Sequence, residues 1–577
     1  MSSESKFVQK SAKVESLLRT KTLEDEEVQR AITEFKSIVS SARGPNGKIK
    51  MIQNSIGGHL TLTSTSCRLL SVTSFSQPVL RLLVSAAQGH LSRFDDGGFN
   101  MIILSLNLIE KSLKFQINHK ILVEIFEEFL DICLNILETD EHLKLPIQIS
   151  KMEHISCLVK TILMSKPLCR CERKNLEVMK NLVIRAFLQS LPDDLKNSSF
   201  SDRIYLKTAT GKSVIESSIH SGLLVEAPDI PTYATGILGK YFTEGESVSV
   251  ALVTISMSGD TEEHVKGSYQ ISQDVRSTDV VLNKMTEFCD VLSKLNVKLL
   301  LCQKVIHPKI KHYLRQMGIF TMDRLGLQPI SYVRDLTGCT PFLSFSFPKA
   351  DHIGRLTSVG LMTISGRSYL HLQNSNSCLV TLVLCAPQEE AVDELKSLVG
   401  TALSTLKHTL SQPFVLPGGG CWQIYLAEAL KLKVQKEMSK LRETVQCSRT
   451  ILSTACRIFT ESLQSVAMAI AEEGETHMTS AIQPHYWRVP NYDESLVDTL
   501  LMCSCGQVKK FGRDLSFLEE NNISESQNES FVKNEDGIIS DFPILLDLYS
   551  SNVSALKMAI LTANTILGIG QFIDDRN

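Results

Sequence analysis

The chain has 577 residues, enough for three or four domains of ordinary size with large buried cores. Its 60 Lys and Arg residues nearly balance 63 Asp and Glu residues, so the net charge of -3 gives no electrostatic reason to expect nucleic acid or an anionic membrane as partner. The N-terminal residues lack the apolar core of a signal peptide, and no apolar run is long enough to span a bilayer. We therefore expect a soluble, intracellular protein with protein partners.

The first helix is predicted to begin near Thr22, because Thr22 and Asp25 resemble a capping box. Its apolar residues recur at helical spacing and are Val28, Ile32, Phe35 and Val39. The helix is expected to end at residues 43–45, Arg-Gly-Pro.

Residues 94–100, FDDGGFN, precede the apolar run MIILSLNLI, which predicts a buried helix. Adjacent carboxylates beside glycines could hold Mg²⁺ through oxygen ligands while a phosphate approaches the backbone. The alternative is an acidic turn that caps a helix, and the motif alone favours the turn because Asp and Gly are common turn residues. Helical patterns continue through residue 190, so the first third is predicted to be mostly helical.

The middle of the chain alternates between strand and helix patterns. The predicted elements are a helix with Leu282, Met285, Cys289 and Leu292 on one face, a strand at 299–303, a helix at 308–317, strands at 319–323 and 378–385, and a helix from Glu389 to about Leu410, before LPGGG. This rhythm is typical of a parallel sheet with crossover helices.

The final third returns to helical patterns. Residues 521–530 are polar and predict an exposed or disordered loop. The last predicted helix runs from Val553 to Leu567 and ends at Gly568. Helical ends around an α/β middle indicate one domain built from both termini, with another domain inserted.

Six motifs occur in a characteristic order along the chain. They are GPNGKIKM (44–51), FDDGG (94–98), GKSVIESSIHSGLLVE (211–226), CQKVIHPKIKHYLRQMGIFTMDR (302–324), PGGG (417–420) and ALKMAILTANTILGIGQFIDD (555–575). Together they resemble the group II chaperonins, the family of the archaeal thermosome and the eukaryotic cytosolic ring chaperonin. LPGGGC, LLLCQKVIHP and MSKP are similar to a divergent vertebrate branch linked to McKusick-Kaufman and Bardet-Biedl syndromes.

The resemblance implies an α+β multidomain fold, that of a group II chaperonin subunit. A helical equatorial domain would comprise residues 1–150 and 410–577, and a small intermediate domain residues 151–216 and 377–409. The inserted α/β apical domain, which would bind substrates or partners, would span residues 217–376.

The resemblance also implies a nucleotide pocket, with ATP and Mg²⁺ as its cofactors. By motif, the nucleotide-binding residues would be Gly44, Pro45, Gly47, Gly97, Lys166, Gly418, Gly419 and Gly420, and the Mg²⁺ ligand would be Asp96. From its chemistry alone, Lys166 fits an exposed lysine at a helix end equally well.

This sequence departs from the family pattern at the pocket. Gly98 and Phe99 stand where the family has two threonines, and a phenyl ring cannot donate a hydrogen bond to phosphate. Thr65 and Thr401 stand where the family has two catalytic aspartates. A threonine hydroxyl cannot accept a proton from water near neutral pH as a carboxylate can. We therefore predict no catalytic residue, and weak or absent binding of ATP and Mg²⁺.

The leading expectation is a chaperonin-like assembly factor that binds unfolded or partner proteins and helps assemble the Bardet-Biedl ciliary trafficking complex. The implied partners are sibling chaperonin-like subunits, the cytosolic ring chaperonin and subunits of that complex, in the cytoplasm, at the centrosome and basal body, and in the nucleus. The alternative is an active ATP-dependent folding chaperonin. Residues 267–281 lack a long amphipathic pattern, so no lid helix is expected there.

Overall fold

A computed structural model provides the structure of most of the chain. The described residues are 17–20, 22–44, 47–53, 57, 60–115, 117–141, 143–166, 173–192, 203–228, 241–242, 246–259, 277–345, 350–470, 509–511, 514–516 and 545–574. The chain forms two compact units. Unit 1 comprises Met1–Leu176 and Ser397–Asn577, and unit 2 comprises Glu177–Lys396.

Unit 1 is mostly helical and is built from both ends of the chain. Its helices are α1 (Glu26–Ser40), α2 (Ser66–Val72), α3 (Pro78–Phe94), α4 (Gly98–Lys114), α5 (His119–Thr139), α6 (Met152–Met164), α13 (Cys421–Lys436), α14 (Met438–Val445), α15 (Arg449–Met468) and α17 (Tyr549–Leu567). Its strands are β1 (Leu17–Thr20), β2 (Lys50–Gln53), β3 (Leu60–Thr63), β4 (Leu145–Pro146), β15 (Phe414–Pro417), β16 (Lys509–Phe511), β17 (Asp514–Ser516), β18 (Leu546–Leu548) and β19 (Gln571–Asp574). Helices α8 (Arg173–Ser190) and α12 (Glu389–Ser411) each cross the boundary between the units.

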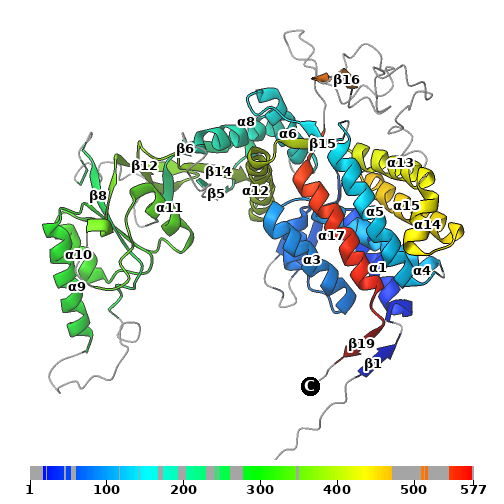
Figure 1. The fold of residues 1–577 in the computed structure, drawn as a ribbon. Helices are drawn as coiled ribbons and strands as arrows, with labels where there is room; N and C mark the ends of the chain where they lie inside the picture. The colour runs from blue at the N-terminus through cyan, green and yellow to red at the C-terminus, as the bar shows by residue number, and fades with distance from the viewer. Residues whose placement is uncertain are drawn as a thin grey trace, which may run out of the picture. The chain divides into compact units, whose positions relative to one another are not determined.

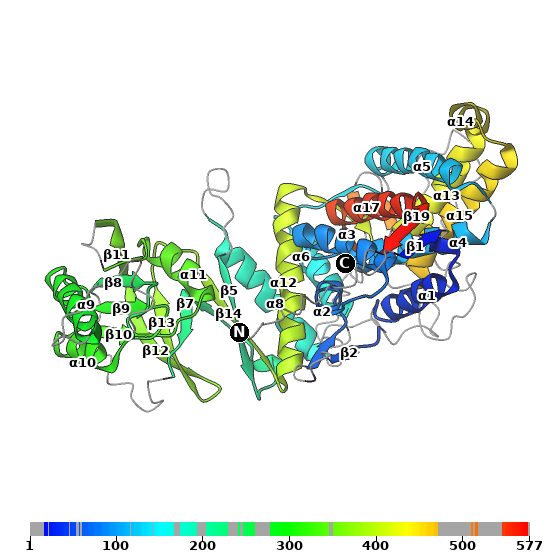
Figure 2. The ribbon, with the colours of Figure 1, turned by 90° about the horizontal axis from the view of Figure 1, so that it is seen from below.

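The two ends of the chain share one core. Helix α17 packs against α3, α4 and α5, as Figures 1 and 2 show. Strands β1 and β19 pair antiparallel, with Leu17 opposite Asp574. The predicted arrangement, in which both termini build one domain, is therefore found in unit 1.

The predicted face of the first helix is confirmed, because the four residues expected to be apolar and inward are all buried in α1. The predicted start at Thr22 is wrong. Thr22–Glu24 form a short 3-10 helix, and the side chain of Asp25 caps α1 by accepting a hydrogen bond from the Glu27 N–H (2.9 Å). Both residues favour the N-cap position, so local chemistry alone did not separate them.

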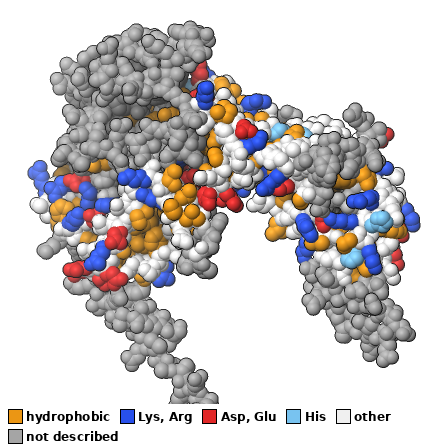
Figure 3. All heavy atoms as spheres, turned by 180° about the vertical axis from the view of Figure 1, so that it is seen from behind, with side chains coloured by type: hydrophobic (Ala, Val, Ile, Leu, Met, Phe, Trp, Pro, Cys, Tyr) orange, Lys and Arg blue, Asp and Glu red, His pale blue; other side chains and the backbone are white. Residues whose placement is uncertain are grey.

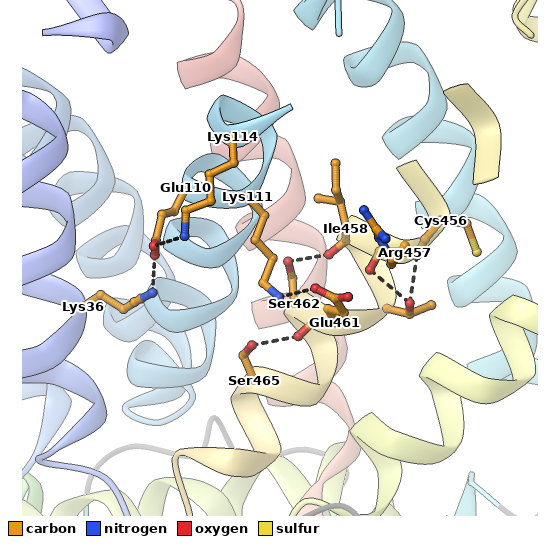
Figure 4. A network of polar contacts seen from close by, with 11 residues as sticks. Lys36, Glu110, Lys111, Lys114, Cys456, Arg457, Ile458, Glu461, Ser462 and Ser465 are labelled. Carbon is orange, nitrogen blue, oxygen red and sulfur yellow. Dashed lines mark hydrogen bonds and ion pairs between the residues drawn. The ribbon is translucent and has the colours of Figure 1, made fainter. Parts of the chain in front are cut away.

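Ion pairs join α1, α4 and α15 on the outside of this core, as Figure 4 shows. The Lys36 ammonium on α1 pairs with Glu110 on α4, which also accepts from Lys114 (2.9 Å). Lys111 on α4 pairs with Glu461 on α15 (2.6 Å). The polar faces of three helices are thereby linked across their packing surfaces.

Unit 2 contains most of the sheet structure. Its elements are β5 (Ile204–Thr210), β6 (Ser218–Ser221), β7 (Leu223–Glu226), β8 (Val248–Val253), α9 (Ser277–Lys294), β9 (Leu299–Cys302), α10 (Pro308–Gln316), β10 (Phe320–Met322), α11 (Gln328–Thr337), β11 (Ile353–Leu356), β12 (Ser358–Ile364), β13 (Arg367–Gln373) and β14 (Val380–Ala386), with 3-10 helices at Val214–Glu216 and Ala350–His352. Its sheets have the strand orders β10-β9-β8-β11, β12-β13-β7 and β5-β14-β6.

Strands β8, β9 and β10 run parallel, with helices between them, which confirms the α/β rhythm predicted for this segment. Alternate residues of β9 are buried in two different hydrophobic cores. Leu299 and Leu301 pack on the side of α11, and Leu300 packs on the side of α9 and α10. Figure 2 shows the sheet between these helices. A strand buried on both faces accounts for the unbroken apolar run LLLC.

The helix predicted after residue 389 is α12, but β15, which follows it and precedes the triple glycine, was missed. Phe414–Pro417 pairs with β18 and β4, so the chain is already extended before Gly418. The polar stretch 521–530 and most of 267–281 lie outside the described residues, and the last part of 267–281 begins α9. The lid prediction therefore stays a prediction.

The three-domain division also stays a prediction, although both expected equatorial segments fall within unit 1 and the expected apical segment falls within unit 2. On the face of unit 1 drawn in Figure 3, Lys and Arg side chains are mixed with Asp and Glu side chains. Within the described part of the chain, no helix combines the length and apolar character needed to cross a membrane.

Candidate functional site

The FDDGG motif forms the corner between α3 and α4. Asp95 ends α3 in the left-handed conformation (φ 57°), and Gly97 (φ 82°) precedes the first residue of α4. A Cβ atom at Gly97 would lie 2.9 Å from Nε2 of His90, so both the backbone conformation and the space require glycine. His90 Nε2 donates to the Asp96 carbonyl (2.9 Å). The acidic turn is thus held in place by α3.

This corner borders a cavity of about 190 Å³ inside unit 1. Residues from segments far apart in the sequence line it, including the loop after α1, the ends of α3 and α6, the start of α4, and the stretch from β18 into α17. The charged residues among them are Arg43, Asp95, Asp96, Lys166 and Asp547. The proposed motifs therefore meet at one concave site.

The structure brings together some of the predicted site residues. Gly44, Asp96, Gly97, Lys166 and Gly419 line the cavity. Gly47, Gly418 and Gly420 are not among its lining residues, and Pro45 lies outside the described residues. The role of each in binding nucleotide or Mg²⁺ stays a prediction.

The glycines outside the lining shape the surrounding backbone. A Cβ atom at Gly418 would lie 2.9 Å from the backbone of Leu545, so glycine lets β15 and the start of β18 approach closely. Gly420 (φ 93°) precedes α13, and a Cβ atom there would lie 2.9 Å from the Cβ of Ala467. These two glycines position the cavity wall to which Gly419 contributes.

Lys166 is oriented towards the cavity. Its Nζ donates to the Ser64 carbonyl (2.6 Å) and lies 5.3 Å from the centre of the Phe99 ring. Phe99 itself is 5% exposed and lines the cavity. The lysine is therefore part of the site, and its ammonium group rests against an aromatic face where the family pattern would place a hydroxyl.

Thr65 and Thr401 both line the cavity, and both hydroxyls are engaged in hydrogen bonds. The Thr65 Oγ1 lies 3.3 Å from the Ser397 Oγ. The Thr401 Oγ1 donates to the carbonyls of Asp95 (3.2 Å) and Ser397 (3.1 Å). The hydrogen bonds of these two side chains connect α12 to the acidic corner and to the start of α2. Both hydroxyl groups therefore have a structural role.

Sequence reasoning missed two charged residues of the cavity, Arg43 and Asp547. Nη1 of Arg43 donates to the Val466 carbonyl (2.6 Å), and Oδ2 of Asp547 accepts from the Trp422 indole N–H (3.1 Å). Asp547 carries a sequence signal, since it is the one charged residue in the apolar stretch PILLDLY. Arg43 carries a weaker signal, as the residue before the first glycine of GPNGK.

Burial controls the ionisation of both residues. It lowers the pKa of Arg43 to about 10, against the carboxylates of Asp547 and Asp96, which raise it. Burial together with the charge of Asp96 raises the pKa of Asp547 to about 6, although Arg43 and the Trp422 hydrogen bond lower it. The positive charge of Arg43 therefore interacts with the negative charges of Asp96 and Asp547 in this cavity.

The N-terminus of α4 supplies an anion-binding element. Gly97, Phe99 and Asn100 line the cavity at this end, and no side chain caps the helix there. Free N–H groups and the helix dipole both favour a phosphate at such a position. A resident metal ion fits less well, because no group of three or more His, Cys, Asp or Glu side chains in the described residues could hold one.

Comparison with known proteins agrees with this architecture. Residues 35–577 match the TCP-1/cpn60 chaperonin family. Molecular chaperone MKKS of Homo sapiens is 29% identical over 582 aligned residues, which cover 98% of this chain and 99% of that protein. Molecular chaperone MKKS of Mus musculus is 28% identical with the same coverage. Thermosome subunit alpha of Saccharolobus shibatae is 22% identical and covers 77% of this chain and 78% of that subunit. The chain therefore belongs to the TCP-1/cpn60 chaperonin family, as a divergent group II-like member.

Proposed function

We propose that this protein is a chaperonin-like assembly factor that binds unfolded or partner proteins and hydrolyses little or no ATP. The observation that carries the proposal is that Thr65 and Thr401 line the cavity of unit 1. The resemblance to the family matches these two positions to catalytic aspartates. A positioned general base typically contributes about 10²-fold to 10⁴-fold to a reaction rate. Two engaged hydroxyls cannot supply that contribution.

The proposed partner surface lies at the carboxyl ends of the three parallel strands β8, β9 and β10 in unit 2, whose sheet also contains the antiparallel strand β11. Leu327 lies in the loop after β10, and Leu343 follows a parallel bridge between Phe342 and Val253 at the end of β8. Their exposed fractions are 79% and 78%, the highest among the exposed large apolar residues of the described chain. Because β8, β9 and β10 are parallel, both leucines stand at the same edge of the sheet.

Further side chains at this edge suit protein binding. Val305, in the loop after β9, is 39% exposed, and the neighbouring Lys304 is also exposed. Arg324, in the loop after β10, is exposed as well. We call these five residues, Lys304, Val305, Arg324, Leu327 and Leu343, the sheet edge of unit 2. Large apolar side chains bordered by basic ones are typical of protein-binding surfaces.

We further propose that the partners are sibling chaperonin-like subunits, the cytosolic ring chaperonin and subunits of the Bardet-Biedl ciliary trafficking complex, at the centrosome and basal body as well as in the cytoplasm. Support comes from the similarity to proteins named molecular chaperones and from the ring assemblies that chaperonins form from related subunits. The β2–β3 hairpin offers a second place where a related subunit could bind. Its two strands pair only with each other among the described strands, and its Met51 side chain is 70% exposed.

The test of this function compares two double variants in a binding assay. Leu327→Ser with Leu343→Ser should reduce both the capture of co-expressed sibling subunits and the suppression of aggregation of a denatured model protein, each by roughly tenfold, the loss expected when two anchor residues are removed. The matched control is Leu432→Ser with Leu561→Ser, which changes two exposed leucines of unit 1 (47% and 38% exposed). Equal losses in both double variants would contradict a dedicated surface on unit 2.

An active, ATP-dependent folding chaperonin is the second candidate, and one observation favours it. The cavity keeps Asp96, Lys166 and an uncapped helix N-terminus together. Asp96→Ala distinguishes the candidates, because an assembly factor with a degenerate site should capture its partners nearly unchanged. A folded Asp96→Ala variant that loses partner capture would place the ATP-driven function first.

A further inference from the structure

The cavity of unit 1 contains its own fixed cation. Arg43 immediately follows the turn that ends α1, and its Nη1 is held by the Val466 carbonyl at the end of α15 (2.6 Å). A guanidinium has five N–H donors, and within the described residues this is the one hydrogen bond that it makes. The remaining donors belong to a side chain that lines the cavity, so they are available to a ligand.

Two carboxylates from opposite ends of the chain interact electrostatically with this guanidinium. Asp96 belongs to the corner held by His90, and Asp547 is anchored by its hydrogen bond from Trp422 (3.1 Å). Both carboxylates raise the pKa of Arg43 against the effect of burial. Part of the negative charge that would attract a divalent cation is therefore already offset by a residue of the chain.

A divalent cation at Asp96 would meet unfavourable conditions. It would face the fixed positive charge of Arg43 and the Lys166 ammonium group, which line the same cavity. The donor set is also small, since no three His, Cys, Asp or Glu side chains of the described residues are placed to hold one metal ion together. Mg²⁺ usually keeps its water and phosphate ligands and takes one or two carboxylates, so a competing cation removes much of its attraction.

The same arrangement suits a phosphate group directly. Arg is well matched to phosphate oxygens, because its planar fork can donate two parallel hydrogen bonds. Lys166 and the free N–H groups at the start of α4 border the same cavity. We propose that Arg43 takes the place of the divalent cation, so that the cavity binds a phosphate-bearing nucleotide without Mg²⁺. This binding is independent of the partner-binding role of unit 2, and it requires no hydrolysis.

The test measures ATP binding to the purified full-length chain by titration calorimetry, once in excess EDTA and once in excess Mg²⁺. We expect the two dissociation constants to agree within about twofold. Arg43→Met, which keeps the length but removes the charge, should weaken binding in EDTA by roughly tenfold or more, as loss of a charge-assisted contact does. Excess Mg²⁺ should restore part of that loss, because the carboxylates are then free to attract the metal.

Two further variants control for folding and charge. Arg43→Lys keeps the cation but loses the planar fork, so it should weaken ATP binding in EDTA less than Arg43→Met does. Arg457→Met removes an arginine that stacks on Phe115, away from the cavity, and should leave ATP affinity unchanged. Thermal unfolding of each variant verifies its fold.

Three outcomes would overturn the proposal. They are no ATP binding by the natural protein under either condition, binding that requires Mg²⁺, and unchanged affinity of a folded Arg43→Met variant in EDTA. If Arg43→Met does not fold, the comparison between EDTA and Mg²⁺ in the natural protein decides alone. Because partner capture is measured separately, a failure here leaves the sheet edge of unit 2 untouched.

Discussion

Unit 1 and unit 2 distribute their polar and apolar side chains in opposite ways. Unit 1 directs charged residues inward, where Arg43, Asp96 and Asp547 share one cavity. Unit 2 keeps the interior of its parallel sheet apolar on both faces and exposes leucines at the sheet edge. The difference favours different tasks for the two units, with an internal site that contains charges of both signs in unit 1 and the proposed partner surface in unit 2.

The fold of unit 1 does not depend on carboxylates at positions 65 and 401. The hydroxyls of Thr65 and Thr401 still connect α12 with the surrounding elements through hydrogen bonds. These contacts connect the wall of the cavity with hydroxyl groups alone at the two positions.

The largest effect is expected from Leu300→Ala in unit 2. Leu300 is fully buried in the central strand β9, so its truncation leaves a cavity and should lower the free energy of unfolding by about 2–5 kcal/mol. That loss is comparable with the whole stability of a marginal domain, so partner capture should also fail. Denaturant unfolding and a pull-down of sibling subunits measure the two effects.

Leu327→Ala is the matched control for this variant. Leu327 is 79% exposed, so the same truncation should change the free energy of unfolding by less than about 0.5 kcal/mol. Similar destabilisation by both changes would show that Leu327 is packed rather than available to partners. The contrast between the interior and the edge of unit 2 would then fail.

An intermediate effect is expected from Gly97→Ala in unit 1. The left-handed backbone and a contact of 2.9 Å with His90 Nε2 should together cost about 1–3 kcal/mol. Gly57→Ala is the control, since Gly57 has a similar φ of 78° and no described atom within 4 Å of its Cβ position. Thermal unfolding of both variants isolates the steric part. Equal losses would mean that the acidic corner is not held tightly by α3.

The smallest effect is expected from the ion pairs in Figure 4. Burial raises the pKa of Glu110, but the ammonium groups of Lys36 and Lys114 lower it by more than burial raises it. The pKa of Glu110 therefore lies below the usual 4.5. A lowered carboxyl pKa stabilises the fold above the unfolded value, and this stability is lost as pH falls through the folded value. Lys36→Gln should therefore remove less than about 1 kcal/mol near neutral pH and less still in acid.

Urea unfolding at neutral and acidic pH measures this dependence. Lys120→Gln, at an exposed lysine on α5, is the control and should show no such difference between the two pH values. If Lys36→Gln were costlier in acid than at neutral pH, the assignment of the pair to Glu110 would be wrong. The pairing of Lys36 with Glu110 would then not stabilise unit 1.

The sequence predicted best what depends on local periodicity. The buried face of α1, the central strand β9 and the last helix α17 all follow from apolar spacing, because packing selects that spacing directly. Short elements that depend on distant partners were missed. Strand β15, for example, exists through its pairing with β4 and β18, and nothing local to residues 414–417 distinguishes it from a loop.

The same limit applies to the candidate site. Motifs placed Asp96, Gly97 and Lys166 at the cavity because each lies in a recognisable pattern. Arg43 and Asp547 come from opposite ends of the chain and meet only after α17 packs with the N-terminal helices. The pKa values of Arg43 and Asp547 are shifted because both residues are buried near each other in the folded chain. A local sequence pattern cannot predict such a shift.

The steady-state rate of ATP hydrolysis by the purified chain, measured with Mg²⁺ beside an assembled thermosome, shows whether unit 1 is an active ATPase. We predict a rate at least about 10²-fold below that of the thermosome, because Thr65 and Thr401 supply no general base. A rate within tenfold of the thermosome would contradict it and would make this protein an ATP-driven folding machine.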